Sequence, residues 1–369
     1  MKTLIITKID IYKLNIRFNK PFRVSLGVAE AAKNILVRIH ADDGLYGLGE
    51  GAPVWYITGE TQTIAFEAAK DIARLLIGKN PLDVETRMKE LNAFLIHNTT
   101  AKSAFDMALY DLLSKHAGLP LYALLGGPKR EFYTDLTVGI NTPAVMAKEA
   151  LDIQAKDFPA IKIKLGTGRN EDVARVRAIR KAVGPDIPIR IDANQGWDSV
   201  TAVSILNDLA SYNIQYCEEP VPHWDNAGLL RVREGSPIPI TADESLFDHH
   251  DAFRLASMGA CDYFNIKLTK SGGIHNAIKI NAIAEGAGIK CMLGSMAETR
   301  LGLSAAAHLV SARPNIVFAD LDTVFTHVED PVKGGITYDG GKITLPDAPG
   351  HGAEIEPQYL EKLYSVSIT

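Results

Sequence analysis

Five short apolar segments in the middle of the chain each end in a lysine or a carboxylate. The residues are Lys164, Asp192, Glu218, Asp243 and Lys267. The steps from 192 to 218, 243 and 267 are 26, 25 and 24 residues, each the length of one strand–helix unit. Because consecutive units of a parallel barrel place their strand ends side by side, we expect these side chains around one mouth.

The three carboxylates of this series predict a metal site. Like charges that converge at short range are costly unless a cation neutralises them. Hard oxygen ligands from three separate strands suit Mg²⁺, so we expect Asp192, Glu218 and Asp243 to hold it. Glu219 would point to the opposite face of its strand and support the ligands from behind. The alternative is a set of surface acids at loop starts.

The lysines predict proton transfer. Lys162 and Lys164 are two apart in a strand and share a face, whereas Ile161 and Ile163 take the other. Crowding two ammonium groups beside a metal should lower the pKa of one of them toward that of a working base. Lys267 should face the metal from the opposite side. A base on each side of a bound carbon is an arrangement that inverts a stereocentre.

The segments that carry these residues belong to a cycle of strands and helices. Eight short apolar or β-branched runs in about 185 residues predict an α/β fold with a TIM-like barrel. The alternative, an open doubly wound sheet, lacks its glycine-rich fingerprint after the first strand. The predicted strands are 135–139, 161–165, 189–192, 214–218, 238–242, 263–267, 290–293 and 316–319.

A different pattern precedes the barrel. Residues 2–50 read as strands and 61–117 as helices, which predicts a separate α+β unit. The Gly/Pro-rich tail should return to that unit. We therefore divide the chain into an α+β capping domain (1–127), a barrel with the active site (128–334) and a C-terminal segment (335–369).

Composition narrows the class of protein. The net charge is −5, 46% of residues are hydrophobic and 22% are charged, without a basic run. These values argue against nucleic-acid and membrane partners. The three cysteines form no CxxC pair, and no apolar run is long enough for a signal peptide or a membrane span. We expect a cytoplasmic enzyme that acts on a small molecule and assembles as a homo-oligomer.

Five motifs carry a family resemblance. KIKLG, RIDANQGW, CEEPV, ADES and NIKLTKSGG occur in this order. Their spacing resembles the enolase superfamily, in its muconate-lactonizing-enzyme-like subgroup. The resemblance implies a modified (β/α)₇β barrel under an N-terminal α+β cap. It also implies Mg²⁺ on Asp192, Glu218 and Asp243, with acid/base lysines at Lys164 and Lys267.

The eighth strand discriminates within that subgroup. It leads into Asp320 and Asp322, and an Asp-x-Asp pair there resembles the dipeptide epimerases, in which it receives the ammonium of the substrate. Two carboxylates away from the metal would form a cation site. Ser295 lies in a stretch that resembles the peptide-lining segment of those enzymes. Thr137 and Lys162 match further substrate-binding positions.

The loop at residues 20–28 is the expected specificity loop. The resemblance implies that alanyl-glutamate epimerases place an arginine where this chain has Gly27; Arg23 lies four residues earlier. This difference favours a small or apolar C-terminal residue. We predict an isomerase that inverts the α-carbon of the C-terminal residue of a dipeptide, Ala-Ala or Ala-hydrophobic. The alternatives are an L-Ala-D/L-Glu epimerase, an N-acylamino-acid racemase, a muconate cycloisomerase-type lyase, or a barrel that only binds ligand.

Overall fold

The first part of the chain folds as an antiparallel sheet covered by helices on one face. The computed structural model describes residues 4–369. The sheet has the order β17-β1-β2-β3, and isoleucines and valines on one face pack against alanine-rich helix faces. The elements are β1 (Ile6–Val24), β2 (Gly27–Ala41), β3 (Tyr46–Gly51), α1 (Gln62–Leu76), α2 (Val84–Phe94), α3 (Thr99–His116) and α4 (Leu121–Leu124).

The second part is an eight-stranded parallel barrel, and each predicted strand is present. The sheet order runs from β5 to β12 without interruption, and a parallel bridge between Thr134 and Ala319 joins its two edges. The strands are β5 (Leu136–Val138), β6 (Ile161–Lys164), β7 (Ile189–Asp192), β8 (Ile214–Glu218), β9 (Ile240–Ala242), β10 (Tyr263–Lys267), β11 (Lys290–Gly294) and β12 (Ile316–Ala319).

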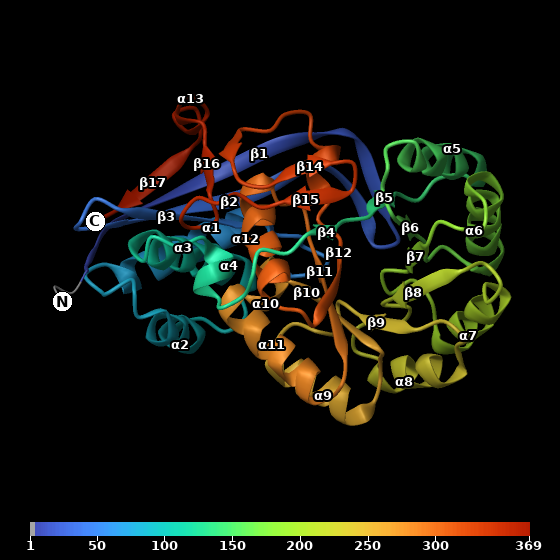
Figure 1. The fold of residues 1–369 in the computed structure, drawn as a ribbon. Coiled ribbons are helices and arrows are strands. Elements are labelled where there is room, and N and C mark those ends of the chain that lie inside the picture. Colours follow the sequence, from blue (N-terminus) through green and yellow to red (C-terminus); the bar gives the residue numbers. More distant parts are fainter. Residues whose placement is uncertain (1–3) are drawn as a thin grey trace.

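Helices surround the barrel strands (Figure 1). Ile161 and Ile163 of β6 belong to the large apolar core of the barrel, as the strand alternation predicts. The helices are α5 (Pro143–Gln154), α6 (Arg169–Val183), α7 (Ser199–Asp208), α8 (Asn226–Gly235), α9 (His249–Met258), α10 (Leu268–Ser271), α11 (Ile274–Gly286) and α12 (Arg300–Ala312), and a 3₁₀ turn, η1 (Thr323–Thr326), follows β12.

The C-terminal segment returns to the N-terminal sheet. Its last strand, β17 (Ser365–Ile368), pairs antiparallel with β1, so the C-terminus lies at the edge of the N-terminal sheet (Figure 1). The division of the chain at residue 127 stays a prediction. The remaining elements are β4 (Phe132–Tyr133), β13 (Val332–Gly334), β14 (Thr337–Asp339), β15 (Lys342–Thr344), β16 (Ala353–Ile355) and α13 (Pro357–Leu360).

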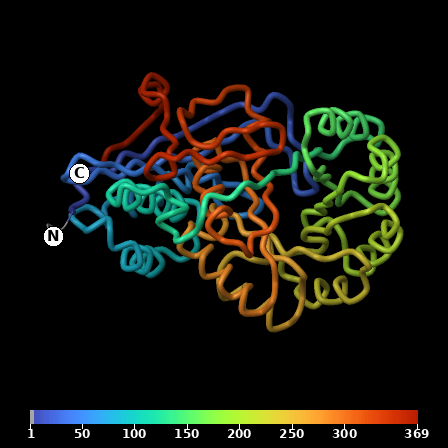
Figure 2. Tube along the Cα trace, in the orientation of Figure 1, coloured from blue at the N-terminus to red at the C-terminus, as the bar shows by residue number. Residues whose placement is uncertain are grey.

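The hairpin of β1 and β2 links the two parts. It extends from the N-terminal sheet across to the barrel, where its tip lies beside β5 and β6 (Figures 1 and 2). Two hydrogen bonds fasten the tip: Ile140 N donates to the carbonyl of Arg23 (2.9 Å), and Ser25 Oγ donates to the carbonyl of Asn194 (2.7 Å). The predicted specificity loop is therefore the end of a long hairpin that reaches the barrel mouth.

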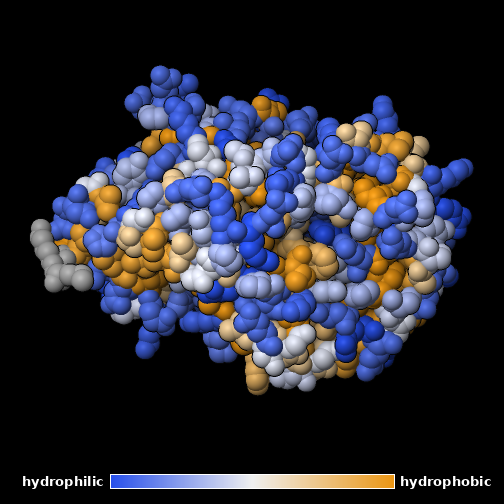
Figure 3. All heavy atoms as spheres, viewed as in Figure 1, coloured by the Kyte–Doolittle hydropathy of each residue, from blue (hydrophilic) through white to orange (hydrophobic). Residues whose placement is uncertain are grey.

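Among residues 4–369, no helix combines the length and apolar character needed to cross a bilayer. Figure 3 shows one face of the molecule, on which hydrophilic side chains are widespread and apolar side chains form separate patches.

Candidate active site

Cross-strand pairing sets the row of charged side chains at the barrel mouth. Lys164 of β6 is the register partner of Asp192 on β7, and Asp192 is the partner of Glu218 on β8. Asp243 follows β9 directly, and Lys267 ends β10. Because parallel strands end together, the predicted five residues occupy one rim of the barrel in sequence order.

The three carboxylates converge on one point. Asp192, Glu218 and Asp243 each offer an oxygen within 4.8 Å of the others, and all three side chains are fully buried. Burial and the nearby Asp192 raise the pKa of Glu218 to about 7. Burial would also raise the pKa of Asp243, but Lys267 and Lys270 hold it below its usual range. A buried oxygen triad of this kind fits Mg²⁺, which prefers carboxylate ligands.

Glu219 stands behind the triad, as predicted. Its Oε2 accepts hydrogen bonds from Asp243 N (2.6 Å) and Ser245 Oγ (3.0 Å), so it fixes the strand end that carries Asp243. Glu219 has a φ of 34°, in the left-handed region. A strained backbone of this kind is tolerated where surrounding contacts enforce it. It lets the side chains of Glu218 and Glu219, which are consecutive, point in different directions.

Lys164 and Lys267 stand at the two ends of the carboxylate row. Lys164 Nζ lies 2.6 Å from Asp192 Oδ2, and Lys267 Nζ lies 2.7 Å from Asp243 Oδ2. Both side chains line the same cavity of about 100 Å³. Burial lowers the pKa of Lys267, but Asp243 and Glu218 outweigh it and raise the pKa above its ordinary value. Two amines therefore approach one small cavity from different strands.

Lys162 does not line this cavity. Its fully buried ammonium lies 2.7 Å from Glu218 Oε2 and 2.7 Å from Asp320 Oδ2. Although burial opposes its charge, Asp320 and Glu218 raise its pKa well above the ordinary value. The expectation that crowding lowers a lysine pKa does not hold for Lys162, because carboxylates surround it. Its contact with substrate stays a prediction; in the structure it is an internal cation that bridges two acidic groups.

A second group of carboxylates lies across the barrel. Asp135, Asp320 and Asp322 have oxygens within 4.8 Å of one another. Burial raises the pKa of Asp322 to about 7, and Asp320 adds to this effect. Burial opposes the charge of Asp320, yet Lys162 and Lys164 lower its pKa to about 2. The two aspartates of the predicted ammonium site therefore differ. Asp320 already pairs with Lys162, whereas Asp322 lines the cavity.

The remaining predicted contacts lie beside this group. Thr137 and Ser295 both line the catalytic cavity. Thr137 N donates to Asp322 Oδ2 (2.7 Å), and Ser295 Oγ donates to the carbonyl of Asp320 (2.9 Å). These bonds orient the acidic group from β5 and β11.

The sequence patterns missed several polar and charged groups that complete the site. Lys270 Nζ lies 2.6 Å from Asp243 Oδ1, and Asn265 Nδ2 donates to Glu218 Oε1 (2.7 Å). Asp135 joins the second acidic group and pairs with Arg190 Nη1 at 2.8 Å. Lys270 belongs to the NIKLTKSGG motif, three residues after Lys267, but no spacing rule gave it a role. Asp135 precedes the first barrel strand, where no spacing rule marked it.

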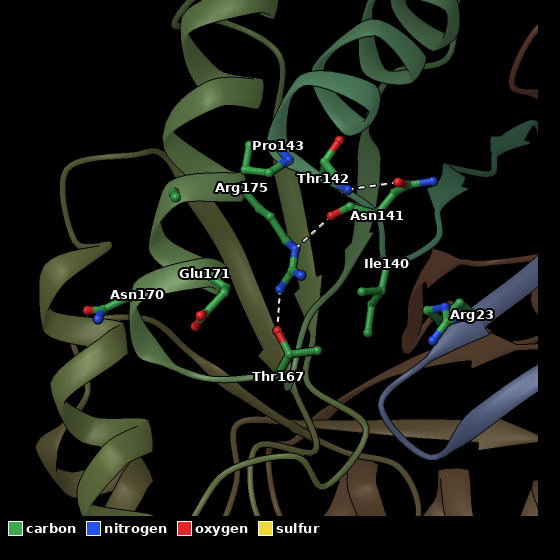
Figure 4. A pocket seen from close by; sticks show the side chains of 10 residues that line it. Arg23, Ile140, Asn141, Thr142, Pro143, Thr167, Asn170, Glu171 and Arg175 are labelled. Atoms are coloured by element: carbon green, nitrogen blue, oxygen red, sulfur yellow. Dashed lines mark hydrogen bonds between the residues drawn. The ribbon is translucent and has the colours of Figure 1, made fainter.

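The hairpin supplies an apolar wall to the cavity. Phe22 and Val24 line it together with Tyr56 and Met296, whereas Arg23 lines a different pocket on the outside of the hairpin. Figure 4 shows Arg23 there, on the hairpin across from Ile140. Alternation along a strand explains the split, since residues 22 and 24 share a face and residue 23 takes the other.

Glu50 docks the N-terminal sheet onto the barrel. Its fully buried carboxylate accepts hydrogen bonds from Thr299 N, Thr299 Oγ1, Gly302 N and Asn34 Nδ2 at 2.7–3.1 Å. A carboxylate at the first turn of α12 satisfies free N–H groups and complements the helix dipole. Because α12 follows the segment with Ser295, this contact ties the sheet to one wall of the cavity.

Family models match both parts of the chain. Residues 6–126 match the mandelate racemase / muconate lactonizing enzyme N-terminal domain, and residues 145–359 match the enolase C-terminal domain-like family. The chain is 44% identical to a D-Ala-D/L-Ala epimerase from Cytophaga hutchinsonii, over 99% of this chain and 100% of that protein. It is 40% identical to an L-Ala-D/L-Glu epimerase from Bacillus subtilis, over 94% and 96%.

Solved structures agree with these matches. A dipeptide epimerase from Cytophaga hutchinsonii, complexed with Mg and D-Ala-L-Val, superposes with a TM-score of 0.98, with 44% identity over 99% of this chain and 100% of that one. One from Enterococcus faecalis, complexed with Mg and L-Leu-L-Tyr, gives 0.93, with 43% identity over 95% and 99%. The chain therefore belongs to the mandelate racemase / muconate lactonizing enzyme family of the enolase superfamily, within its dipeptide epimerase subgroup.

Proposed function

We propose that this protein inverts the α-carbon of the C-terminal residue of a dipeptide whose C-terminal side chain is small or apolar. The observation that carries the proposal is the placement of Lys164 and Lys267 at opposite ends of one carboxylate row, in one cavity. Inversion needs a base on one face of the carbon and an acid on the other. Two amines that enter a cavity of about 100 Å³ from different strands suit that requirement.

The residues divide the work as follows. Asp192, Glu218 and Asp243 would hold Mg²⁺, which when bound supplies positive charge that stabilises the substrate carboxylate as the α-proton leaves. Asp322 accepts the ammonium of the peptide at the other end of the cavity. Lys164 or Lys267, as the free amine, takes the α-proton, and the other, protonated, returns a proton to the opposite face.

Lys162 and Lys270 act as fixed charges in this scheme. Lys162 lies between Glu218 and Asp320, and Lys270 pairs with Asp243. Both are fully buried, and carboxylates rather than water surround their ammonium groups. They limit the repulsion between the acidic groups and so let these groups remain close.

The wall of the cavity supports an apolar C-terminal residue. Phe22 and Val24 face inward and Arg23 faces outward, so the hairpin offers no cation to a glutamate side chain. At position 27, an added side chain would meet the Tyr56 ring, since a Cβ there would lie 3.3 Å from Tyr56 Cε1. The Ala-Glu activity named for the Bacillus subtilis relative is therefore the second candidate and not the first.

An N-acylamino-acid racemase or a cycloisomerase-type lyase would use the same lysines. The acidic group that contains Asp322 argues against both. An N-acylated amino acid offers a neutral amide and a cycloisomerase substrate is an anion, so neither brings a cation to these buried carboxylates as the ammonium of a dipeptide does.

A dipeptide library in D₂O tests the proposal. Mass spectrometry should find one deuterium in each substrate, at the C-terminal α-carbon, with the largest rates for Ala-Ala and Ala-Val. N-acetyl-Ala-Ala is the matched control without an ammonium group. Faster exchange of the acetylated compound would contradict the peptide assignment, and absence of exchange in every dipeptide would contradict the activity.

The protein is further proposed to work in the cytoplasm as a homo-oligomer, without nucleic acid or membrane. Cys217, Cys261 and Cys291 are free and buried, which supports a reducing compartment. The exposed rings of Trp224 and Phe253 provide apolar surface for a second copy. Light scattering of the purified protein measures the oligomeric state; a mass of one chain, 40.1 kDa, would contradict the assembly.

A further inference from the structure

A second cavity lies in the seam between the N-terminal helices and the barrel. It has a volume of about 800 Å³, and α3 contributes one wall while α9, α10 and the start of α11 contribute others. Figure 1 shows these elements facing each other, α2 and α3 in teal and α9 to α11 in orange. None of the predicted catalytic, metal or substrate residues lines this cavity.

Lys102 of α3 is the main unexplained group of this seam cavity. Its side chain lines the cavity and is only 5% exposed, yet no ion pair within 4.0 Å joins it among residues 4–369. Glu60 is the carboxylate that acts on it electrostatically, but Glu60 Oε2 accepts from Thr100 N and Thr100 Oγ1 instead. Removing most of a lysine side chain from water without an ion-pair partner costs free energy, and burial accordingly lowers the pKa of Lys102.

Three further polar atoms around the seam cavity lack hydrogen-bond partners: Ser271 Oγ, His249 Nδ1 and Asn276 Oδ1, of which the last is an acceptor. Ser271 Oγ is buried at the end of α10, and His249 Nδ1 is buried at the start of α9; neither has a partner in the described chain. Lys102 and Ser271 lie on facing elements: a Cβ on Gly272 would be 3.8 Å from Lys102 Cβ. An ammonium, a hydroxyl and an imidazole can each donate a hydrogen bond to an oxyanion.

The carboxylates that line the seam cavity, Asp248 and Asp251, already have hydrogen-bond or ion-pair partners. Asp248 accepts hydrogen bonds from His250 N and Asp251 N, which forms the N-terminal cap of α9. Asp251 Oδ2 accepts from Phe247 N, and Asp251 Oδ1 lies 2.7 Å from Arg254 Nη1. Helix N–H groups and an arginine thus balance these carboxylates, whereas the donors remain unpaired.

We propose that the seam cavity binds a small oxyanion, a carboxylate or phosphate group, between Lys102 and Ser271. Binding there rests on the seam geometry alone. Its effect on turnover rests also on the proposed function: Ile57 lines both the seam cavity and the catalytic cavity, and α10 directly follows Lys267. An anion in the seam would therefore hold the segment that carries Tyr56 and so alter the affinity of the catalytic cavity for the peptide.

Calorimetric titration of the metal-free protein tests the binding, with inorganic phosphate and succinate added separately at constant ionic strength. We expect saturable binding of one anion per chain. Lys102→Met should weaken it at least about tenfold, and Ser271→Ala, which changes no charge, by several-fold. Lys89→Met is the matched control: this exposed lysine of α2 lies outside the seam cavity, and its loss should leave the affinity unchanged.

The outcomes are distinguishable. Preference for phosphate or for succinate identifies which group the seam cavity selects. Absence of saturable binding for both anions overturns the proposal. Binding that survives Lys102→Met and Ser271→Ala also overturns it, because the anion would then lie elsewhere, for example between Lys164 and Lys267. If Lys102→Met fails to fold, Ser271→Ala alone decides. A change in KM for Ala-Ala with bound anion tests the coupling separately from the binding.

Discussion

Removal of either catalytic lysine should separate proton exchange from inversion. Lys164→Ala and Lys267→Ala should each lower the rate of epimerisation by at least about a thousandfold, because every turnover uses both amines. Each variant keeps one amine, so it should still exchange the α-proton of one epimer in D₂O without inverting it. Lys164→Ala should exchange the α-proton of one epimer, and Lys267→Ala that of the other. Exchange and chiral chromatography measure both rates, and wild-type epimerisation by either variant would contradict the two-lysine mechanism.

Titration of Asp322 should determine how kcat/KM changes with pH below about 7. Burial and Asp320 raise its pKa to about 7, and the ammonium of a peptide needs the charged form. The kcat/KM for Ala-Ala should therefore rise with pH until about 7. In the free enzyme the same shift has the opposite consequence: a carboxyl whose folded pKa is raised contributes stability at low pH, and this is lost as pH rises through about 7.

Asp322→Asn tests this assignment because it keeps the size and removes the charge. We expect kcat/KM for Ala-Ala to fall by about ten- to a hundredfold and its rise toward pH 7 to disappear. The rate for N-acetyl-Ala-Ala should change little. An unchanged pH profile in the variant would show that another group binds the ammonium or sets the profile.

At the scale of elements, the barrel strands were predictable and the hairpin was not. Each barrel strand is a short run rich in apolar residues, so pattern and length agree. The hairpin continues through Arg17, Lys20 and Arg23, whose charges interrupt the alternation; its length depends on docking against Ile140 and Asn194. Helix α2 lies within the predicted helical range 61–117, but its bounds were not predictable, because its charged sequence has only a weak apolar face, which packs against α3.

The hairpin should determine which C-terminal residue is accepted. Because Phe22 and Val24 face the cavity and Arg23 does not, we expect Ala-Val and Ala-Ala to exceed Ala-Glu in kcat/KM by about ten- to a hundredfold. Arg23→Ala should leave this ratio unchanged, whereas Val24→Arg should raise the relative rate with Ala-Glu. A preference of the wild type for Ala-Glu that Arg23→Ala abolishes would show that Arg23 turns inward.

At the scale of the whole molecule, the charged groups couple the barrel to its cap. Fully buried Glu50 joins the N-terminal sheet to α12, while Lys162 joins two acidic groups across the barrel. The sequence predicted the metal ligands because each ends a strand, but these connections depend on how distant elements pack. A cation bound by Asp192, Glu218 and Asp243 should therefore increase the stability of the whole barrel, because it connects the ends of three strands.

Removal of divalent ions should abolish turnover and lower the unfolding midpoint. At a Mg²⁺ concentration one hundred times the Kd, binding stabilises the folded state by about 2.7 kcal/mol. Asp243→Asn should lose most of this Mg²⁺-dependent increment, because it removes one charged ligand. It should also unfold more easily without Mg²⁺, since Lys267 and Lys270 then lack their carboxylate partner. The increment, measured by thermal unfolding with Mg²⁺ and with EDTA, separates the two effects. Asp71→Asn, at an exposed position of α1, is the control and should keep the full increment. Full activity in excess EDTA would exclude a role for the metal, and an undiminished increment in Asp243→Asn would place it elsewhere.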